Sequence, residues 1–149
     1  MKVIFLDIDG VLNHKDTFKQ GHKFHGCFGI QPELAQKLNR ITDATGAVLV
    51  LSSAWRKVRT WEENMEYFKQ QGITGKFKGQ TPVCDTLSGT SNRGEEIAEW
   101  LVFRSEWIDS FIVLDDIKVK RYQDRQILTI EDVGLTDEDV EKAIKMLEG

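Results

Sequence analysis

Three short apolar runs, each followed at once by polar residues, restrict the folds that this chain can adopt more than any other feature of its sequence. The runs are Val3–Leu6, Ala47–Leu51 and Phe111–Leu114. Continuous runs of this length, rich in β-branched residues, are typical of strands that are buried on both faces, as in a parallel sheet. Segments with helical spacing lie between them. This alternation predicts an α/β fold with a mostly parallel central sheet.

The intervening segments show where helices and further strands should lie. After Pro32, the residues Leu34, Leu38 and Ile41 repeat at helical spacing, and Gly46 suits the end of that helix. Further helices are expected over about residues 60–71, 93–103 and 136–147, and the last has a capping-box-like start. Shorter strands are expected at 76–80 and 126–130. The pattern therefore predicts five strands.

Length, charge and cysteine content limit the classes of protein to which this chain can belong. The chain has 149 residues, which predicts one domain over residues 1–149. Two cysteines are too few for a disulfide framework and favour a reduced, cytoplasmic environment. No apolar stretch is long enough to span a bilayer, so we expect no membrane association. A net charge of -4 argues against a large nucleic-acid footprint but allows a local basic patch.

The polar residues that follow the strands indicate chemistry. Asp7 and Asp9 follow the first strand, Ser52 follows the second, and Asp115 and Asp116 follow the run at Phe111–Leu114. Ligands of such sheets bind at the carboxyl ends of the strands. Several carboxylates that meet there would repel one another unless a divalent cation joined them, and oxygen ligands of this kind favour Mg²⁺. A carboxylate can also act as a nucleophile toward phosphate esters.

These motifs resemble those of the haloacid dehalogenase (HAD) superfamily of phosphohydrolases. Residues Phe5–Asn13 resemble its first motif, Leu51-Ser52 its second, and Phe111–Asp116 its fourth, in the same order. The resemblance implies a three-layer Rossmann-like fold with strand order 3-2-1-4-5. It also implies a Mg²⁺-dependent phosphatase that forms an aspartyl-phosphate intermediate.

The resemblance assigns a role to each acidic residue. It makes Asp7 the nucleophile and a metal ligand, and Asp9 the general acid and base whose backbone carbonyl also binds the metal. Ser52 would bind the phosphoryl group that is transferred. Asp116 would bind Mg²⁺, with Asp115 nearby or bound through water.

The third motif of the superfamily is usually a Lys, and here the sequence departs from the pattern. Arg93 stands at the start of the helix that leads into the fourth motif, so we assign it this role; the alternative is a solvated helix residue. Gly10, Ser53 and Arg56 are expected to contact the substrate. Ser52 is preferred to Ser53 as the phosphate contact because it directly ends the apolar run.

A narrower resemblance concerns the HAD domain of Swiss Army knife RNA repair proteins. It rests on four segments, which are Leu51–Arg56, Gly79–Pro82, Arg93–Ile97 and Gly134–Thr136. It implies phosphorylated nucleic-acid ends, or nucleotides, as substrates. Two alternatives remain, which are a catalytically silent module that binds phosphate, and a phosphatase of small metabolites or phosphoproteins.

The stretches that separate the motifs are too short for an added cap domain. About 40 residues lie between Gly10 and Ser52, with a similar number between Ser53 and Arg93, and helices occupy much of both. We therefore expect an open site that admits large substrates, and no obligate protein partner. Residues 14–30 are expected to form a flap or a long hairpin. The spacing of His14, His22, His25 and Cys27 matches no standard zinc site.

Basic and aromatic residues around the motifs allow further expectations. The cations near the second and fourth motifs could line a basic rim or form an ordinary solvated surface; they are Arg56, Lys57, Arg59, Lys118, Lys120, Arg121 and Arg125. Among the tryptophans, Trp55 is expected near the substrate. Trp100 and Trp107 are expected in the core.

Overall fold

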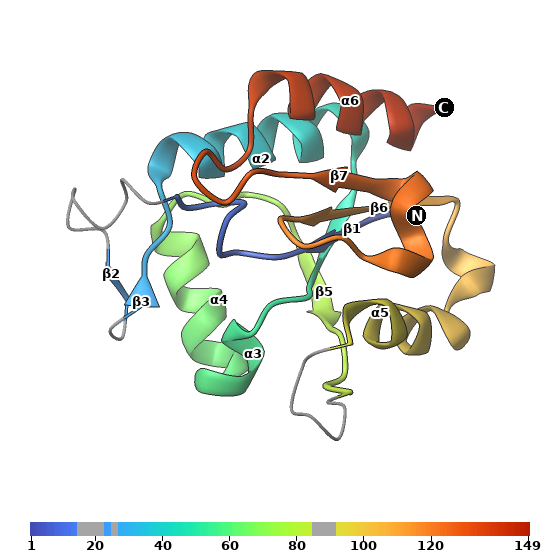
Figure 1. Ribbon diagram of the computed structural model, residues 1–149, viewed down its shortest axis with the longest axis horizontal. Helices are drawn as coiled ribbons and strands as arrows, with labels where there is room; N and C mark the ends of the chain where they lie inside the picture. Colours follow the sequence, from blue (N-terminus) through green and yellow to red (C-terminus); the bar gives the residue numbers. More distant parts are fainter. Residues whose placement is uncertain (15–22, 25–26, 85–91) are drawn as a thin grey trace.

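The computed structural model describes residues 1–14, 23–24, 27–84 and 92–149 (Figure 1). Its centre is a five-stranded parallel sheet in the order β5-β4-β1-β6-β7. Counted along the chain, these strands stand in the order 3-2-1-4-5, which confirms the expected topology. The strands are β1 (Lys2–Leu6), β4 (Val48–Leu51), β5 (Phe77–Gln80), β6 (Ser110–Asp115) and β7 (Gln126–Leu128).

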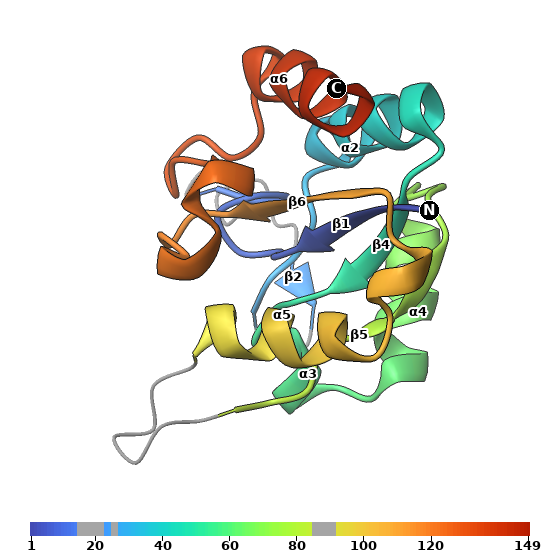
Figure 2. The same cartoon turned by 90° about the vertical axis from the view of Figure 1, so that its right-hand side faces the viewer.

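Helices cover both faces of this sheet, so the fold has three layers. Figures 1 and 2 show α2 and α6 side by side over one face and α5 on the other. The helices are α2 (Pro32–Thr45), α3 (Trp55–Val58), α4 (Trp61–Gln70), α5 (Arg93–Val102) and α6 (Asp137–Glu148), with short 3-10 helices η1 (Ser105–Trp107) and η2 (Lys120–Arg125). The sequence pattern did not indicate α3, η1 or η2, because helices of three to six residues are too short to show a period.

Alternate side chains of the buried strands point into two separate cores. Ile4 and Leu6 of β1 pack with residues of α2, α4 and α6, whereas Val3 and Phe5 pack with Ile97 and other residues on the α5 side. All four strand residues are fully buried. Burial on both faces explains why β1 is a continuous apolar run rather than an alternating one.

Local signals set the helix ends where the sequence predicted them. Gly46 closes α2 with a left-handed φ of 71°, which a side chain would make costly. Thr60 begins α4 and Thr136 begins α6, and each forms a reciprocal capping box. The strand predicted at 126–130 is shorter and ends at Leu128.

Trp107 was predicted in the core, but it is 63% exposed, because α5 ends at Val102 and Trp107 lies in the separate 3-10 helix η1. Trp100 is buried as predicted. Within residues 14–30, the short strands β2 (Lys23–Phe24) and β3 (Cys27–Phe28) pair antiparallel, in keeping with a hairpin. His22 and His25 lie outside the described residues, as does the Cys27 side chain.

Within the described ranges, no helix combines the length and the apolar character needed to cross a membrane.

Candidate active site

The register of the three central strands brings their carboxyl ends to one level. Leu6 of β1 pairs with Leu51 of β4 and with Leu114 of β6. The next residue of each strand or loop is therefore Asp7, Ser52 or Asp115. Backbone hydrogen bonds fix these positions, since the Asp7 N–H donates to Leu114 O and the Ser52 N–H donates to Leu6 O. The polar residues singled out in the sequence thus meet at one edge of the sheet.

Three carboxylates form a compact acidic cluster at this edge. Asp7, Asp115 and Asp116 each offer one oxygen, and these oxygens all lie within 4.8 Å of one another. Asp7 and Asp115 are buried. Oxygen atoms so arranged could hold a metal ion, and the donor set suits a hard divalent cation. Asp9 contributes no carboxylate to this cluster.

Burial makes the charges of this cluster costly without a cation. Burial raises the pKa of Asp7 well above its ordinary value, Asp115 and Asp116 raise it further, and Arg93 opposes the rise. Burial likewise raises the pKa of Asp115 to about 6, although Arg93 and the N–H of Ile117 stabilise its charged form. A cation bound by these oxygens would favour the charged forms of Asp7 and Asp115, which burial disfavours.

Gly10 allows the loop after β1 to approach the acidic cluster. Its φ is 81°, and a Cβ built on it would lie 2.4 Å from Asp116 Oδ2. The buried Thr129 hydroxyl donates to Gly10 O at 2.7 Å, and the Thr129 N–H donates to Asp115 O. The structure thus gives Gly10 a steric role beside Asp116, and any contact with substrate stays a prediction.

Asp9 lies at the exposed side of the site, where two side chains hold it. Asn13 Nδ2 donates to Asp9 Oδ1 at 2.9 Å, and Trp55 Nε1 donates to the same oxygen at 3.1 Å. Asn13 and Trp55 are both buried, whereas Asp9 is exposed. The Trp55 ring packs against Tyr67 and Phe68 of α4. Trp55 therefore contacts Asp9, and its expected place near the substrate stays a prediction.

The two serines that follow β4 have different surroundings. Ser53 is buried, and its Oγ accepts the N–H of Trp55, which starts α3. Ser52 is also buried, but its Oγ has no hydrogen-bond partner among the described residues. A buried hydroxyl without a partner is costly. This difference favours Ser52 as the group left available for a phosphate oxygen.

Arg93, at the start of α5, reaches into the acidic cluster. Its NH1 atom donates to Asp115 Oδ2 and lies 3.4 Å from Asp7 Oδ1. Its side chain is 11% exposed, and its Nε has no hydrogen-bond partner within the described part of the chain. A guanidinium that touches Asp7 and still has a free donor can bind a phosphoryl oxygen as well. This placement suits the charge-balancing role assigned to Arg93.

Arg56 lies deeper than a contact with substrate would require. Its side chain is 1% exposed, and its donors bind Ser53 O, the Thr81 hydroxyl and the Glu96 carboxylate. Glu96 belongs to α5, one turn after Arg93, and is fully buried. The pair therefore ties the segment after β4 to the helix that carries Arg93. This geometry favours a structural role for Arg56 over the direct contact with substrate expected from the sequence.

The Arg56–Glu96 pair should contribute strongly to stability. Replacing Glu96 with Ala leaves a buried guanidinium without its counter-charge, so we expect the free energy of unfolding to fall by roughly 3–5 kcal/mol. Denaturant unfolding measures this loss. Glu95→Ala is the matched control on the same helix, because Glu95 forms an exposed pair with Arg121 and should cost less than about 1 kcal/mol. Equal losses in the two variants would contradict the structural role.

The basic residues near the motifs do not all lie on one surface. Lys118, Lys120 and Arg121 line a pocket of about 360 Å³ together with Arg93. Arg59 is buried, and its guanidinium lies 4.4 Å from the centre of the Trp55 ring. The first three residues therefore lie beside the site and could form part of a basic rim, while Arg59 packs inside.

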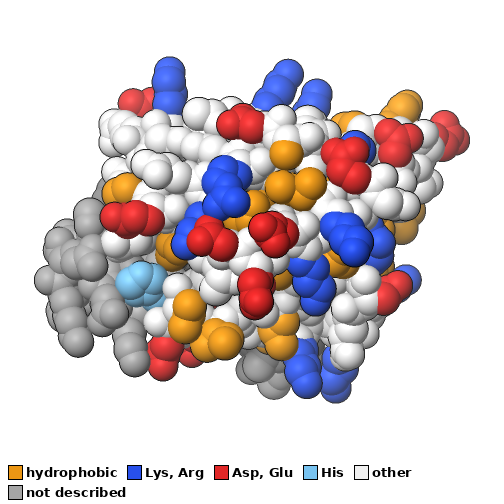
Figure 3. All heavy atoms as spheres, turned by 90° about the horizontal axis from the view of Figure 1, so that it is seen from above, with side chains coloured by type: hydrophobic (Ala, Val, Ile, Leu, Met, Phe, Trp, Pro, Cys, Tyr) orange, Lys and Arg blue, Asp and Glu red, His pale blue; other side chains and the backbone are white. Residues whose placement is uncertain are grey.

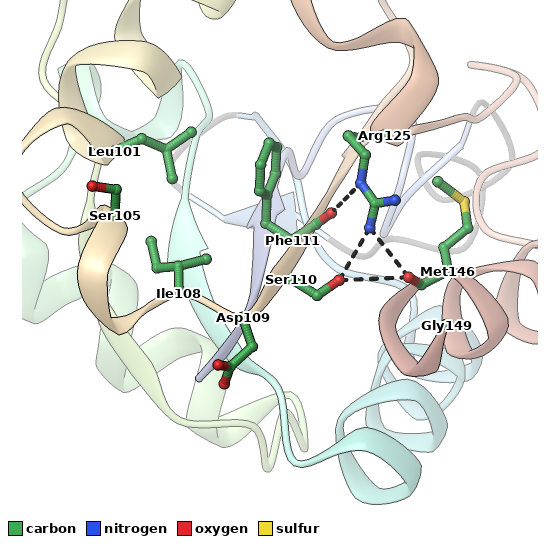
Figure 4. A pocket seen from close by; sticks show the side chains of 9 residues that line it. All are labelled: Leu101, Ser105, Ile108, Asp109, Ser110, Phe111, Arg125, Met146 and Gly149. Carbon is green, nitrogen blue, oxygen red and sulfur yellow. Dashed lines mark hydrogen bonds between the residues drawn. The ribbon is translucent and has the colours of Figure 1, made fainter.

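Arg125 lies at the opposite edge of the sheet and does not belong to such a rim. It donates to Phe111 O and to the Ser110 hydroxyl, at the start of β6, and to Met146 O of α6 (Figure 4). These groups line a mainly apolar pocket of about 430 Å³. Arg125 lies there because it precedes the first residue of β7 and is thus at the beginning of a strand, not at the end.

The face formed by α2 and α6 has no single sign of charge. Figure 3 looks onto this face and shows Lys and Arg side chains interspersed with Asp and Glu. Asp137 of α6, for example, pairs with Arg40 of α2. Such mixed charge does not create the positive field that attracts polyanions.

Sequence reasoning missed two residues of the site, Asn13 and Thr129, and one contact, between Trp55 and Asp9. It did not use Asn13, although this residue ends the first motif, and it did not connect Trp55 with Asp9. It also passed over Thr129, whose position just after β7 places it at the same sheet edge as the other polar residues. The rule that carboxyl ends of parallel strands meet could have identified Thr129.

The comparison with protein families agrees with this geometry. The family model of the HAD domain in Swiss Army Knife RNA repair proteins matches residues 3–140. No curated protein and no solved structure matches the chain significantly. The matched range contains the acidic cluster together with Ser52 and Arg93.

Proposed function

We propose that this chain, which belongs to the family of HAD domains found in Swiss Army Knife RNA repair proteins, is a Mg²⁺-dependent phosphatase with Asp7 as its nucleophile. One observation carries the proposal. The Asp7 carboxylate lies within 4.8 Å of oxygens of Asp115 and Asp116, with Arg93 and the unpartnered hydroxyl of Ser52 at the same sheet edge. A nucleophile, a cation site and phosphate-binding donors are thus assembled together.

The first half of the reaction transfers the phosphoryl group to the protein. An Asp7 oxygen attacks phosphorus, the bond between phosphorus and the ester oxygen breaks, and an aspartyl phosphate forms. Asp9 gives its proton to the departing alkoxide. Ser52 and the free Nε of Arg93 bind phosphoryl oxygens during the transfer, when their negative charge is spread most widely.

The second half releases phosphate. Asp9, now a carboxylate, takes a proton from a water molecule that attacks the phosphorus of the aspartyl phosphate. The bond between Asp7 and phosphorus breaks, and the original carboxylate returns. Bound at Asp7, Asp116 and, directly or through water, Asp115, Mg²⁺ would neutralise charge on the transferring group. Its preference for few protein carboxylates and for phosphate oxygens fits this donor set.

The substrate class that we propose is a phosphorylated nucleic-acid end. Membership of a family from RNA repair proteins supports it, and so does the pocket beside Arg93 that Lys118, Lys120 and Arg121 line. A chain with a second phosphate could place it near these cations. Small metabolites and phosphoproteins are the alternative substrates. A silent module is less consistent with this site, because Asp7 and Asp9 are both present.

A panel of phosphate esters tests the proposal. We expect release of inorganic phosphate, with Mg²⁺, from 3′- or 5′-phosphorylated oligonucleotides at a higher kcat/KM than from mononucleotides, sugar phosphates or phosphopeptides. Asp7→Asn protein serves as the blank for contaminating phosphatases. Preference for a small ester would retain the phosphatase and reject the nucleic-acid end. No release from any ester would support the silent module.

The position of Arg93 also predicts how its replacement by Ala or Lys should change kcat. Arg93→Ala should lower kcat on the order of 30- to 1,000-fold, because a charge-assisted contact to the transition state is worth roughly 2–4 kcal/mol. Arg93→Lys restores a cation and should retain much more activity, with KM changed less than kcat. Steady-state kinetics on the best substrate measures both. If Arg93→Ala were as active as the wild type, Arg93 would be a surface helix residue, and Lys118 would be the next candidate.

A further inference from the structure

The two hydrogen bonds that Asp9 accepts fall on one of its oxygens. Asn13 Nδ2 and Trp55 Nε1 both donate to Oδ1, and none of the contacts among described residues involves Oδ2. The two donors come from distant parts of the chain, since Asn13 ends the loop after β1 and Trp55 begins α3. Both are buried, while Asp9 itself is exposed. One carboxylate oxygen is therefore anchored by two donors, and the other is left without a contact to a described residue.

Neither donor can exchange its role for that of an acceptor. An indole N–H can only donate. The amide of Asn13 can turn in principle, but its Oδ1 accepts the N–H of Gly10 at 3.0 Å, which directs the NH₂ group toward Asp9. A proton on Asp9 Oδ1 would therefore point at two other protons. The anchored oxygen must stay the unprotonated one in both halves of the reaction.

We infer that Trp55 and Asn13 are positioning residues that make Oδ2 the proton-transferring oxygen of Asp9. The inference rests on the proposed phosphatase function and adds to it the device that orients the general acid. The buried Trp55 ring packs against Tyr67 and Phe68, and the Arg59 guanidinium lies 4.4 Å from its centre, so several groups restrict its movement. A fixed carboxyl group loses less freedom when it reaches the transition state.

The dependence on the leaving group separates this role from simple packing. An alkyl phosphate releases an alkoxide, which is a poor leaving group and needs a well-placed proton. In contrast, p-nitrophenyl phosphate releases a stable phenolate, which needs little help from an acid. Loss of orientation at Asp9 should therefore slow the two esters unequally. Loss of packing should slow both alike.

The test uses Trp55→Phe, which removes the N–H and keeps an aromatic ring. The measurement is the first-turnover release of the leaving group, with Mg²⁺, from p-nitrophenyl phosphate and from glycerol phosphate. We expect the rate for glycerol phosphate to fall roughly tenfold or more, and that for the aryl ester by less than about threefold. Trp100→Phe is the matched control, because Trp100 is also buried but packs on Phe5. It should change the ratio of the two rates little.

A second variant keeps the test independent of the folding of the first. Asn13→Asp retains an oxygen for the Gly10 N–H but removes the donor to Asp9, and it should show the same unequal loss. An equal slowing of both esters in Trp55→Phe and Asn13→Asp overturns the inference. If the wild type releases neither leaving group and also releases no phosphate from phosphorylated oligonucleotides, the proposed phosphatase function itself is overturned.

Discussion

Asp7→Asn should abolish turnover, with a loss of at least about 10,000-fold, because a carboxamide is a far poorer nucleophile than a carboxylate. No neighbouring carboxylate is placed to replace Asp7 as the nucleophile. Both oxygens of Asp115 already accept hydrogen bonds, one from Arg93 and the other from the Ile117 N–H. Asp9 is turned toward Asn13 and Trp55. The measurement is phosphate release under conditions in which the wild type turns over many times.

The fold should survive this substitution. Burial disfavours the charged form of Asp7 and raises its pKa, so a neutral amide of the same shape should leave the thermal midpoint of the metal-free protein unchanged or higher. Asp109→Asn is the control: this residue pairs with the amino terminus, away from the acidic cluster, and should retain wild-type turnover. Wild-type activity of Asp7→Asn would show that the covalent mechanism is wrong.

Removal of the metal should have an effect of the same size. In excess chelator we expect no measurable turnover, because Asp7, Asp116 and a phosphate dianion cannot occupy one buried site without a cation. Mg²⁺ or Mn²⁺ should restore activity. Ca²⁺ should bind but support little turnover, since its larger and looser coordination places the nucleophile less well. Full activity in chelator would contradict the metal assignment.

Binding of the metal can be followed without activity. A ligand that binds only the folded state, at about 100 times its dissociation constant, stabilises it by roughly 2.7 kcal/mol. Mg²⁺ should therefore raise the thermal midpoint of the wild type. Asp116→Asn removes one carboxylate of the cluster and should lose most of this rise, whereas Asp109→Asn should keep it.

The positions of Asp7, Ser52 and Asp115 follow from the sequence almost completely. Strands that are buried on both faces must be apolar throughout, so each apolar run revealed a central strand, and the first polar residue after it marked a carboxyl end. Parallel pairing then brings those ends together, and the register of Leu6 with Leu51 and Leu114 does so directly. Helix ends were equally predictable, because the capping boxes of Thr60 and Thr136 depend on residues three positions apart.

The partners of long polar side chains could be identified only from the tertiary structure. The sequence showed that Arg56 lies next to the second motif, but it did not show which way its guanidinium points. The guanidinium turns inward to Glu96, 40 residues away. Arg125 likewise turns to the beginning of β6. Each of these side chains has several rotatable bonds and can reach partners on several elements, so chain spacing does not select one.

The sequence alone thus determined the five strands of the central sheet, their order along the chain, and the residues that follow them. These features depend on short-range patterns and on the geometry of parallel pairing. What only the tertiary structure decided is which donors meet which acceptors across the site. The Trp55 indole N–H meets Asp9, 46 residues away, and the Arg56 guanidinium meets Glu96, 40 residues away. These contacts depend on how α3 and α5 pack around the sheet edge, since hydrogen bonds require specific distances and directions that residue patterns do not encode across such separations.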